Sequence, residues 1–200
     1  MALPIINTSK YEVTLPVSNK KVLYRPFLVK EEKVLLIAMQ DDSDVTTFNA
    51  IKDMVNACTF GEIDISKIAQ ADAELLFMKI RNKSMGEGVE VIGVCSECGF
   101  KSEIELNLDE LVVEGANEKS DGKIQLSDNC TIIMHHPSIE QYFVAGNEDE
   151  LVAKCIEFIQ IDGVLYDAKD YKKEDLQGFI DNLSKPQEAM IEEYLKNIPT

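Results

Sequence analysis

The sequence predicts an α+β fold, in which antiparallel β-hairpins pack with helices and the chain ends in a helical layer. Short stretches of alternating apolar and polar residues occur in pairs around turn-forming residues, which is typical of hairpins. Longer stretches carry apolar residues at helical spacing, and most of the last third of the chain is of this kind. Strands grouped beside helices favour an α+β arrangement over alternating parallel units.

The chain is expected to open with a hairpin followed by two helices. Residues 11–15 and 21–25 alternate in strand fashion around a proline-containing turn segment. Residues 30–40 and 44–59 then carry apolar side chains at helical spacing. This first part therefore supplies one small sheet and two helices that can pack on it.

A third helix, beginning near Asp72, is expected to lead into a second hairpin with two cysteines at its tip. The helix ends at Gly86, because glycine readily adopts the left-handed conformation of a helix C-cap. Strand-like alternation follows from Val89, and a return strand includes residues 104–108. The sequence Cys95-Ser-Glu-Cys98 forms the tight turn between these strands.

The rest of the chain is expected to contain a loop, a third hairpin and several helices. Residues 114–122 are polar and predict the loop, and residues 124–126 and 131–134 predict the hairpin. Ser138 and Gln141 have the spacing of a capping box, so a helix should start near Ile139. Further helices are predicted at residues 148–161, 173–182 and 186–197, with Asp162-Gly163 as the clearest turn.

Two domains are one interpretation of this order of elements. Residues 1–113 would form a hairpin and helix domain that carries the cysteine hairpin, and residues 114–122 would form a connecting loop. Residues 123–200 would hold the third hairpin and the C-terminal helical region. One continuous domain remains the alternative.

Charge limits the classes of partner. The 200 residues include 36 acidic and 20 basic side chains, which gives a net charge of −16. Such a charge repels nucleic acids and anionic lipids, so we expect neither as a partner. The longest apolar run, residues 34–39, is far shorter than the roughly 20 residues of a membrane-spanning helix, and no signal-peptide pattern begins the chain. We expect a soluble intracellular protein, and no residue pattern indicates its oligomeric state.

The cysteines pose the main chemical question. Their odd number and wide spacing fit reduced thiols, and Cys58 and Cys155 lie in apolar helical patterns typical of core residues. Cys95 and Cys98 have the spacing of half a zinc ribbon, and a structural zinc ion needs two further ligands. Cys130 could supply the third and either His135 or His136 the fourth. A metal-free hairpin and a redox pair are the alternatives to zinc.

Two segments resemble the baseplate hub assembly proteins of T-even-type contractile-tailed bacteriophages. One is Asp72-x-Glu-x-Leu-Phe-x-Lys-Ile-Arg-x-Lys-Ser-x-Gly-Glu87 with the cysteine hairpin after it. The other is the opening from Leu3-Pro4 through Tyr24-Arg-Pro-Phe-Leu-Val-Lys-Glu-Glu-Lys33. The resemblance is good over the first half of the chain and holds only in outline beyond it.

The resemblance implies a role in tail assembly. The chain would act as an assembly chaperone or a hub component, bind baseplate hub proteins and have no enzymatic activity. It would work in the host cell cytoplasm during assembly, and retention in the virion tail baseplate is a further implied outcome. The competing hypotheses are a zinc-ribbon-type binding or regulatory module and a thiol oxidoreductase.

Three cations near the end of the third helix are candidate partner-binding residues. Lys79, Arg81 and Lys83 form a basic group within an acidic chain, and residues four apart on a helix are neighbours. They could meet an acidic partner, or Arg81 could instead be buried against Glu74 or Asp72.

No catalytic group is predicted. The chain contains only two histidines and shows no nucleophile elbow, phosphate-binding loop or metal-hydrolase spacing. We therefore do not expect an enzyme. The last helix, residues 186–197, could offer an apolar interface, with ordinary core packing as the alternative.

Overall fold

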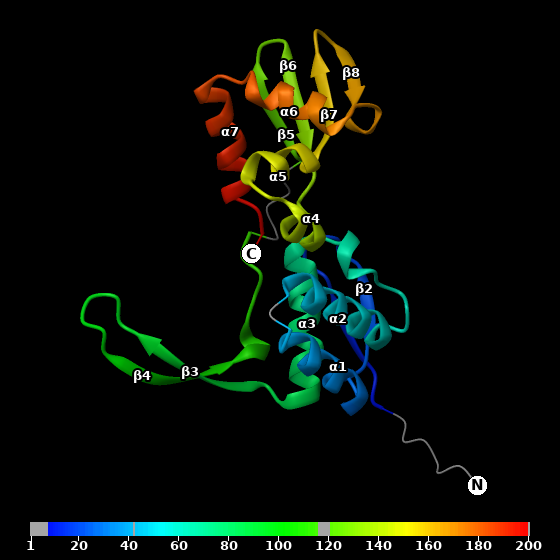
Figure 1. Ribbon diagram of the computed structural model, residues 1–200, viewed down its shortest axis with the longest axis vertical. Helices are drawn as coiled ribbons and strands as arrows, with labels where there is room; N and C mark the ends of the chain where they lie inside the picture. The colour runs from blue at the N-terminus through cyan, green and yellow to red at the C-terminus, as the bar shows by residue number, and fades with distance from the viewer. Residues whose placement is uncertain (1–7, 42, 116–120, 200) are drawn as a thin grey trace. The chain divides into compact units, whose positions relative to one another are not determined.

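The computed structural model describes residues 8–41, 43–115 and 121–199, and it has the α+β fold that the sequence predicts (Figure 1). Two compact units make up the chain. Unit 1 comprises Met1–Leu15, Asn19–Ile65 and Asp72–Val113, and unit 2 comprises Pro16–Ser18, Ser66–Ala71 and Glu114–Thr200. Much of the predicted loop at residues 114–122, and the opening Leu3-Pro4, lie outside the described residues.

Unit 1 begins as predicted, with a hairpin and helices. Strands β1 (Tyr11–Thr14) and β2 (Lys21–Tyr24) pair antiparallel, and α1 (Val29–Met39), α2 (Asp44–Cys58) and α3 (Gln70–Met85) follow. Ser43 caps α2 by accepting a hydrogen bond from the Thr46 N–H. The interior is built from alternate hairpin residues and the inward faces of the helices, and it includes Leu15, Val22, Tyr24, Phe48, Met54, Val55, Cys58, Leu76 and Ile80.

The second hairpin of unit 1 is longer than the first. Strands β3 (Gly88–Val94) and β4 (Lys101–Asn107) pair antiparallel, with Val91 opposite Ile104. A short 3-10 turn (Leu108–Glu110) then brings the buried Leu108 against unit 1. Every residue of β4 is exposed, so the hairpin contributes little to the interior of unit 1.

Unit 2 is a four-stranded antiparallel sheet with helices. The strand order is β5 (Lys123–Ser127), β6 (Cys130–Met134), β7 (Ile156–Ile161) and β8 (Val164–Asp167). The helices are α4 (Ile139–Val144), α5 (Glu148–Cys155), α6 (Lys173–Asp181) and α7 (Lys185–Lys196). Side chains of the sheet and of α5 and α7 share one core, which includes Ile124, Leu126, Ile132, Met134, Leu151, Val152, Cys155, Ile156, Ile159 and Ile191.

Capping places the helices of unit 2 where the sequence predicts their starts. Ser138 and Gln141 form the expected capping box at the start of α4. Ser184 occupies the same position for α7, with a proline in the first turn. Gln187 of α7 donates to the Leu126 carbonyl over 3.1 Å and thereby joins this helix to β5.

The helix predicted over residues 148–161 is wrong in its second half. Helix α5 ends at Cys155, and Ile156–Ile161 form strand β7 instead. Ile159 lies opposite Ile132 of β6 on one side and Tyr166 of β8 on the other. Pairing on both sides satisfies the backbone hydrogen bonds of this segment, and a local helical pattern in the sequence does not reveal such pairing.

In the described residues, no helix is long and apolar enough to cross a membrane.

Candidate functional site

One face of the β3–β4 hairpin is apolar, and the described residues of unit 1 cover it only in part. Val89 lies opposite Leu106 and Val91 lies opposite Ile104, so these four side chains share a face. Ile104 and Leu106 are more than two-fifths exposed, and the two valines are half-buried. Gly93 keeps this face compact, because a Cβ atom there would lie 2.6 Å from Cδ1 of Ile104. We call Val89, Val91, Ile104 and Leu106 the hairpin face.

The opposite face of the hairpin carries acidic side chains. Glu90 lies opposite Glu105, and Glu103 lies opposite Ile92 on the same face, which also exposes the apolar side chains of Ile92 and Val94. From residue 87 to residue 107 the chain has five glutamates and a single lysine, so the hairpin is strongly negative. A surface that combines an apolar face with an acidic back suits a partner whose apolar surface is bordered by cations.

The tip of the hairpin holds the two predicted cysteines. Cys95 and Cys98 are both exposed. The Cys95 N–H donates to the Phe100 carbonyl over 2.9 Å, and the Gly99 N–H donates to the Cys95 carbonyl over 2.9 Å. Hydrogen bonding from the backbone N–H groups of Cys98 and Glu97, together with the Cys98 thiol, lowers the pKa of Cys95.

The other predicted zinc ligands belong to unit 2. Cys130 lies on β6 and packs against the core of that unit, where burial raises the pKa of its thiol. His135 is exposed, and its Nδ1 atom lies 2.9 Å from the His136 carbonyl oxygen. The ring of His136 stacks on Tyr194 with centroids 6.1 Å apart. Across the described parts of the chain, no three His, Cys, Asp or Glu residues gather as a metal site would require.

The predicted basic group holds the base of the hairpin to α3. Lys79 and Lys83 each lie 3.1 Å from a carboxylate oxygen of Asp109, and Lys79 also donates to the Asp109 carbonyl. The Asn82 amide donates to the same carboxylate over 3.1 Å, and these donors lower the pKa of Asp109 well below its usual range. Arg81 donates to the Gly86 carbonyl over 2.9 Å.

These contacts give the three cations a role within unit 1. Lys83 additionally pairs with Glu87, one residue before β3. Cations of α3 therefore bind the residues that flank both strands at the base of the hairpin. Binding of an acidic partner by Lys79, Arg81 and Lys83 stays a prediction, and such a partner would compete with Asp109. Sequence reasoning missed Asp109, and its only sequence signal was the acidic pair Asp109-Glu110 just after the return strand.

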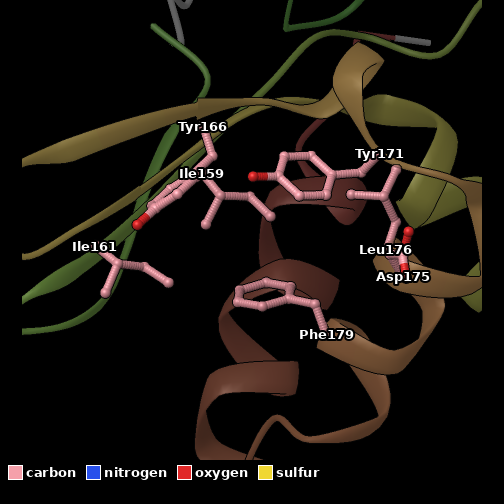
Figure 2. A pocket seen from close by; sticks show the side chains of 7 residues that line it. All are labelled: Ile159, Ile161, Tyr166, Tyr171, Asp175, Leu176 and Phe179. Carbon is pink, nitrogen blue, oxygen red and sulfur yellow. The ribbon is translucent and has the colours of Figure 1, made fainter.

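Unit 2 contains an apolar pocket of about 300 Å³ between the sheet and α6. Figure 2 shows Ile159, Ile161 and Tyr166 reaching it from the strands, and Leu176 and Phe179 reaching it from α6. Tyr171 completes the wall, and its ring lies edge-on to Tyr166 with centroids 6.3 Å apart. The pocket can accept an apolar side chain.

The single carboxylate of this pocket is already engaged. Asp175 accepts a hydrogen bond from the Lys172 N–H over 3.1 Å and so serves the start of α6. The remaining lining residues are aliphatic or aromatic, and they provide no nucleophile beside a base. The sequence did not indicate this pocket, because its two walls come from a strand predicted as helix and from a helix that follows it.

The buried cysteines and the last helix are core elements, as one of the sequence hypotheses held. Cys58 and Cys155 are fully buried, and burial raises the pKa of Cys58 to about 11 and that of Cys155 to about 12. On α7, Ile191 is buried, and Tyr194 packs against the same core while its hydroxyl donates to the Met134 carbonyl over 3.3 Å. The core-packing hypothesis for this helix is therefore confirmed.

The family comparison covers almost the whole chain. A family model described as T4 bacteriophage base plate protein matches residues 8–200. No curated protein and no solved structure matches the chain.

Proposed function

Because the chain belongs to the T4 bacteriophage base plate protein family, we propose that it is a baseplate hub assembly factor of a contractile-tailed phage. It acts through protein–protein contacts, either as a chaperone-like factor or as a component of the hub. It has no enzymatic activity in this proposal. It binds its partners in the host cell cytoplasm during assembly and reaches the virion tail baseplate if it stays with them.

The observation that carries this proposal is the hairpin face, which the described residues of unit 1 cover only in part. A two-stranded hairpin is marginally stable in water unless its apolar face packs on something. Val91 and Ile104 form the centre of this face, and Ile104 is 42% exposed. A partner surface that covers these side chains would remove apolar area from water and would also order the hairpin.

The partner's chemistry follows from the charge on the hairpin. The face opposite the hairpin face is negative, because it carries Glu90, Glu103 and Glu105. Contact through the hairpin with a second copy of the chain would therefore bring like charges together. A hub protein with an apolar groove bordered by lysine or arginine would satisfy both faces. This arrangement supports contact with a different baseplate protein through the hairpin.

The test is co-purification with the baseplate hub proteins of the same phage, produced together with this chain. The variant Val91→Glu places a charge in the centre of the hairpin face. The matched control Ile92→Glu places the same charge one residue along the strand, on the opposite face, where Ile92 is 66% exposed. We expect Val91→Glu to lose the hub protein and Ile92→Glu to retain it.

Circular dichroism and thermal unfolding would verify that both variants fold as the unmodified chain does. Loss of binding in both variants, or in neither, would argue against the hairpin face as the interface. Absence of every hub protein from the unmodified complex would overturn the proposed assembly role itself.

A further inference from the structure

We propose that two copies of this chain associate through helix α1, with the two helices antiparallel about a twofold axis. This contact goes beyond the assembly role and uses no residue of the hairpin face. Three observations support it: the apolar side chains that α1 exposes, the order of charged and apolar residues along the helix, and the groove beside it.

Helix α1 exposes most of its large apolar side chains. Five of them are each more than half exposed, namely Val29, Val34, Leu36, Ile37 and Met39. The helix packs on α2 along its other side, where Ala38 is buried and its carbonyl accepts a hydrogen bond from the Thr47 hydroxyl over 3.3 Å (Figure 1). The described residues of unit 1 therefore leave a wide apolar surface on α1 open. Soluble monomers rarely expose such a patch, and it usually marks an interaction site.

One row of residues along α1 has opposite charges at its two ends. An α-helix completes a turn about every 3.6 residues, so positions separated by four, three and four residues line up along it. Lys30, Val34, Ile37 and Asp41 have this spacing. Asp41 lies just beyond the helix but stays close to this line, because its N–H donates to the Ala38 carbonyl over 3.2 Å. The row therefore consists of a cation, two apolar residues and an anion.

This row is complementary to itself when one copy is turned end for end. In an antiparallel pair, Lys30 of one copy meets Asp41 of the other, and Val34 meets Ile37. A twofold axis forms each of these contacts twice. A parallel pair would instead place lysine against lysine and aspartate against aspartate, which is repulsive. The order of these residues thus points to a second copy of the chain, in one orientation.

Both charged ends of the row are available for this contact. Lys30 and Asp41 are exposed, and neither forms an ion pair with another of the described residues. Although the whole chain is acidic, residues 20–40 contain five Lys or Arg against two Glu. Repulsion between two copies is therefore weaker at α1 than at the glutamate-rich hairpin.

A groove beside the row gives the contact its shape. It lies between α1 and α2 and has a volume of about 360 Å³. Its lining residues are Lys30, Glu31, Val34, Ala50, Asp53 and Met54. Val34 forms part of the wall, so the Ile37 side chain of the other copy, which lies opposite Val34, can enter the groove. Packing a ridge of side chains into the groove of another helix is the usual way in which helices associate.

The first test is the oligomeric state of the full chain, measured by sedimentation velocity in a reducing buffer from micromolar to near-millimolar protein. We expect an equilibrium between monomer and dimer. Ile37→Glu places a charge within the contact and should raise the dissociation constant about a hundredfold or more. The matched control Ile92→Glu makes the same change on the hairpin at nearly equal exposure, 66% against 67%, and should leave dimerisation unchanged. A chain that stays monomeric throughout, or equal effects of the two substitutions, would overturn the proposal.

Two charge-reversed variants test the antiparallel orientation. Lys30→Glu and Asp41→Lys each bring like charges together at both ends of the contact, so each alone should weaken its homodimer about tenfold. Mixed in equal amounts, the two variants should form a heterodimer of nearly the original affinity, because each end of the mixed pair again joins opposite charges. Native mass spectrometry, with one variant tagged, distinguishes the heterodimer from both homodimers.

Neither reversal should disturb the helix, because an anion near its N-terminus and a cation near its C-terminus both favour the helix dipole. Circular dichroism would verify that both variants fold. Absence of the heterodimer from a mixture of folded variants would overturn the antiparallel contact. None of these results depends on whether hub proteins bind the hairpin face, so failure of this proposal is distinguishable from failure of the assembly role.

Discussion

Arg25 and Glu31 form a two-bond ion pair that joins the end of β2 to the start of α1. The Arg25 Nη2 atom lies 2.7 Å from Oε1 of Glu31, and Nη1 lies 2.9 Å from Oε2. Glu31 also accepts the Leu28 N–H over 2.7 Å and so satisfies a free donor at the helix start. Their side chains are only 12% and 10% exposed, and Arg25 Nη1 also reaches the Cys58 sulfur. One pair thus holds a hairpin, a helix start and a core thiol together.

Glu31→Gln is expected to lower the free energy of unfolding by about 3 kcal/mol, because it leaves the Arg25 guanidinium largely buried without its counter-charge. The matched control is Glu12→Gln, which removes the exposed ion pair with Lys21 and should cost less than about 1 kcal/mol. Urea unfolding monitored by circular dichroism measures both. Equal losses in the two variants would show that burial does not set the strength of the Arg25–Glu31 pair.

Acid should weaken the contribution of this pair. The Arg25 side chain, followed by the Leu28 N–H, lowers the pKa of Glu31 below its ordinary value of 4.5. A depressed pKa in the folded state contributes stability above the unfolded-state pKa, and that stability is lost as pH falls through the folded-state value. The difference in unfolding free energy between the unmodified chain and Glu31→Gln should therefore be constant near pH 7 and shrink below about pH 4.5. A difference that stays constant to pH 3 would contradict this.

Asp109→Asn should loosen the base of the β3–β4 hairpin. The change removes the negative charge shared by Lys79 and Lys83, and we expect a loss of about 1 to 2 kcal/mol in unit 1. Hydrogen exchange should become faster in β3 and β4, while the sheet of unit 2 keeps its protection. Glu110→Gln is the control, because its carboxylate meets only the Asn107 amide in the contacts described for it. Equal exchange in the two variants would exclude Asp109 as the anchor.

Gly122→Ala should destabilise unit 2 strongly. Gly122 has φ of 69°, and an added Cβ would lie 2.0 Å from the Met134 carbonyl oxygen, which is backbone and cannot rotate away. The control Gly163→Ala also stands at a positive φ, 82°, but its Cβ would meet nothing within 4 Å. We expect about 1 kcal/mol for the control, from conformation alone, and at least about 3 kcal/mol for Gly122→Ala. Thermal unfolding of both variants tests the difference.

Local sequence signals predicted most elements of this fold. The Cys95-x-x-Cys98 turn, the Ser138 capping box and the Asp162-Gly163 turn all depend on a few neighbouring residues, and each is present in the structure. The failure at Ile156–Ile161 has a non-local cause. That segment becomes a strand because β6, more than twenty residues earlier, pairs with it.

The same limit applies to the candidate site. Sequence identified the exposed cysteine turn and the cluster of Lys79, Arg81 and Lys83, since both are compact motifs. It could not show that Lys79 and Lys83 meet Asp109, because that contact joins residues some thirty positions apart. Nor could it show that the hairpin face is only partly covered, since alternating apolar residues look the same in a strand that packs on a core.

The opposed glutamates of the hairpin have a consequence for how the protein behaves before it meets any partner. Both outer edges of a two-stranded hairpin carry backbone groups that could template further strands, which is a route to aggregation. Glu90 and Glu105 face each other across the strands, and this repulsion costs the hairpin some stability. The same charges make it unfavourable for the strand edges of other copies to pair with the edges of this hairpin. The chain thereby trades rigidity in this segment for solubility while its apolar face is still open.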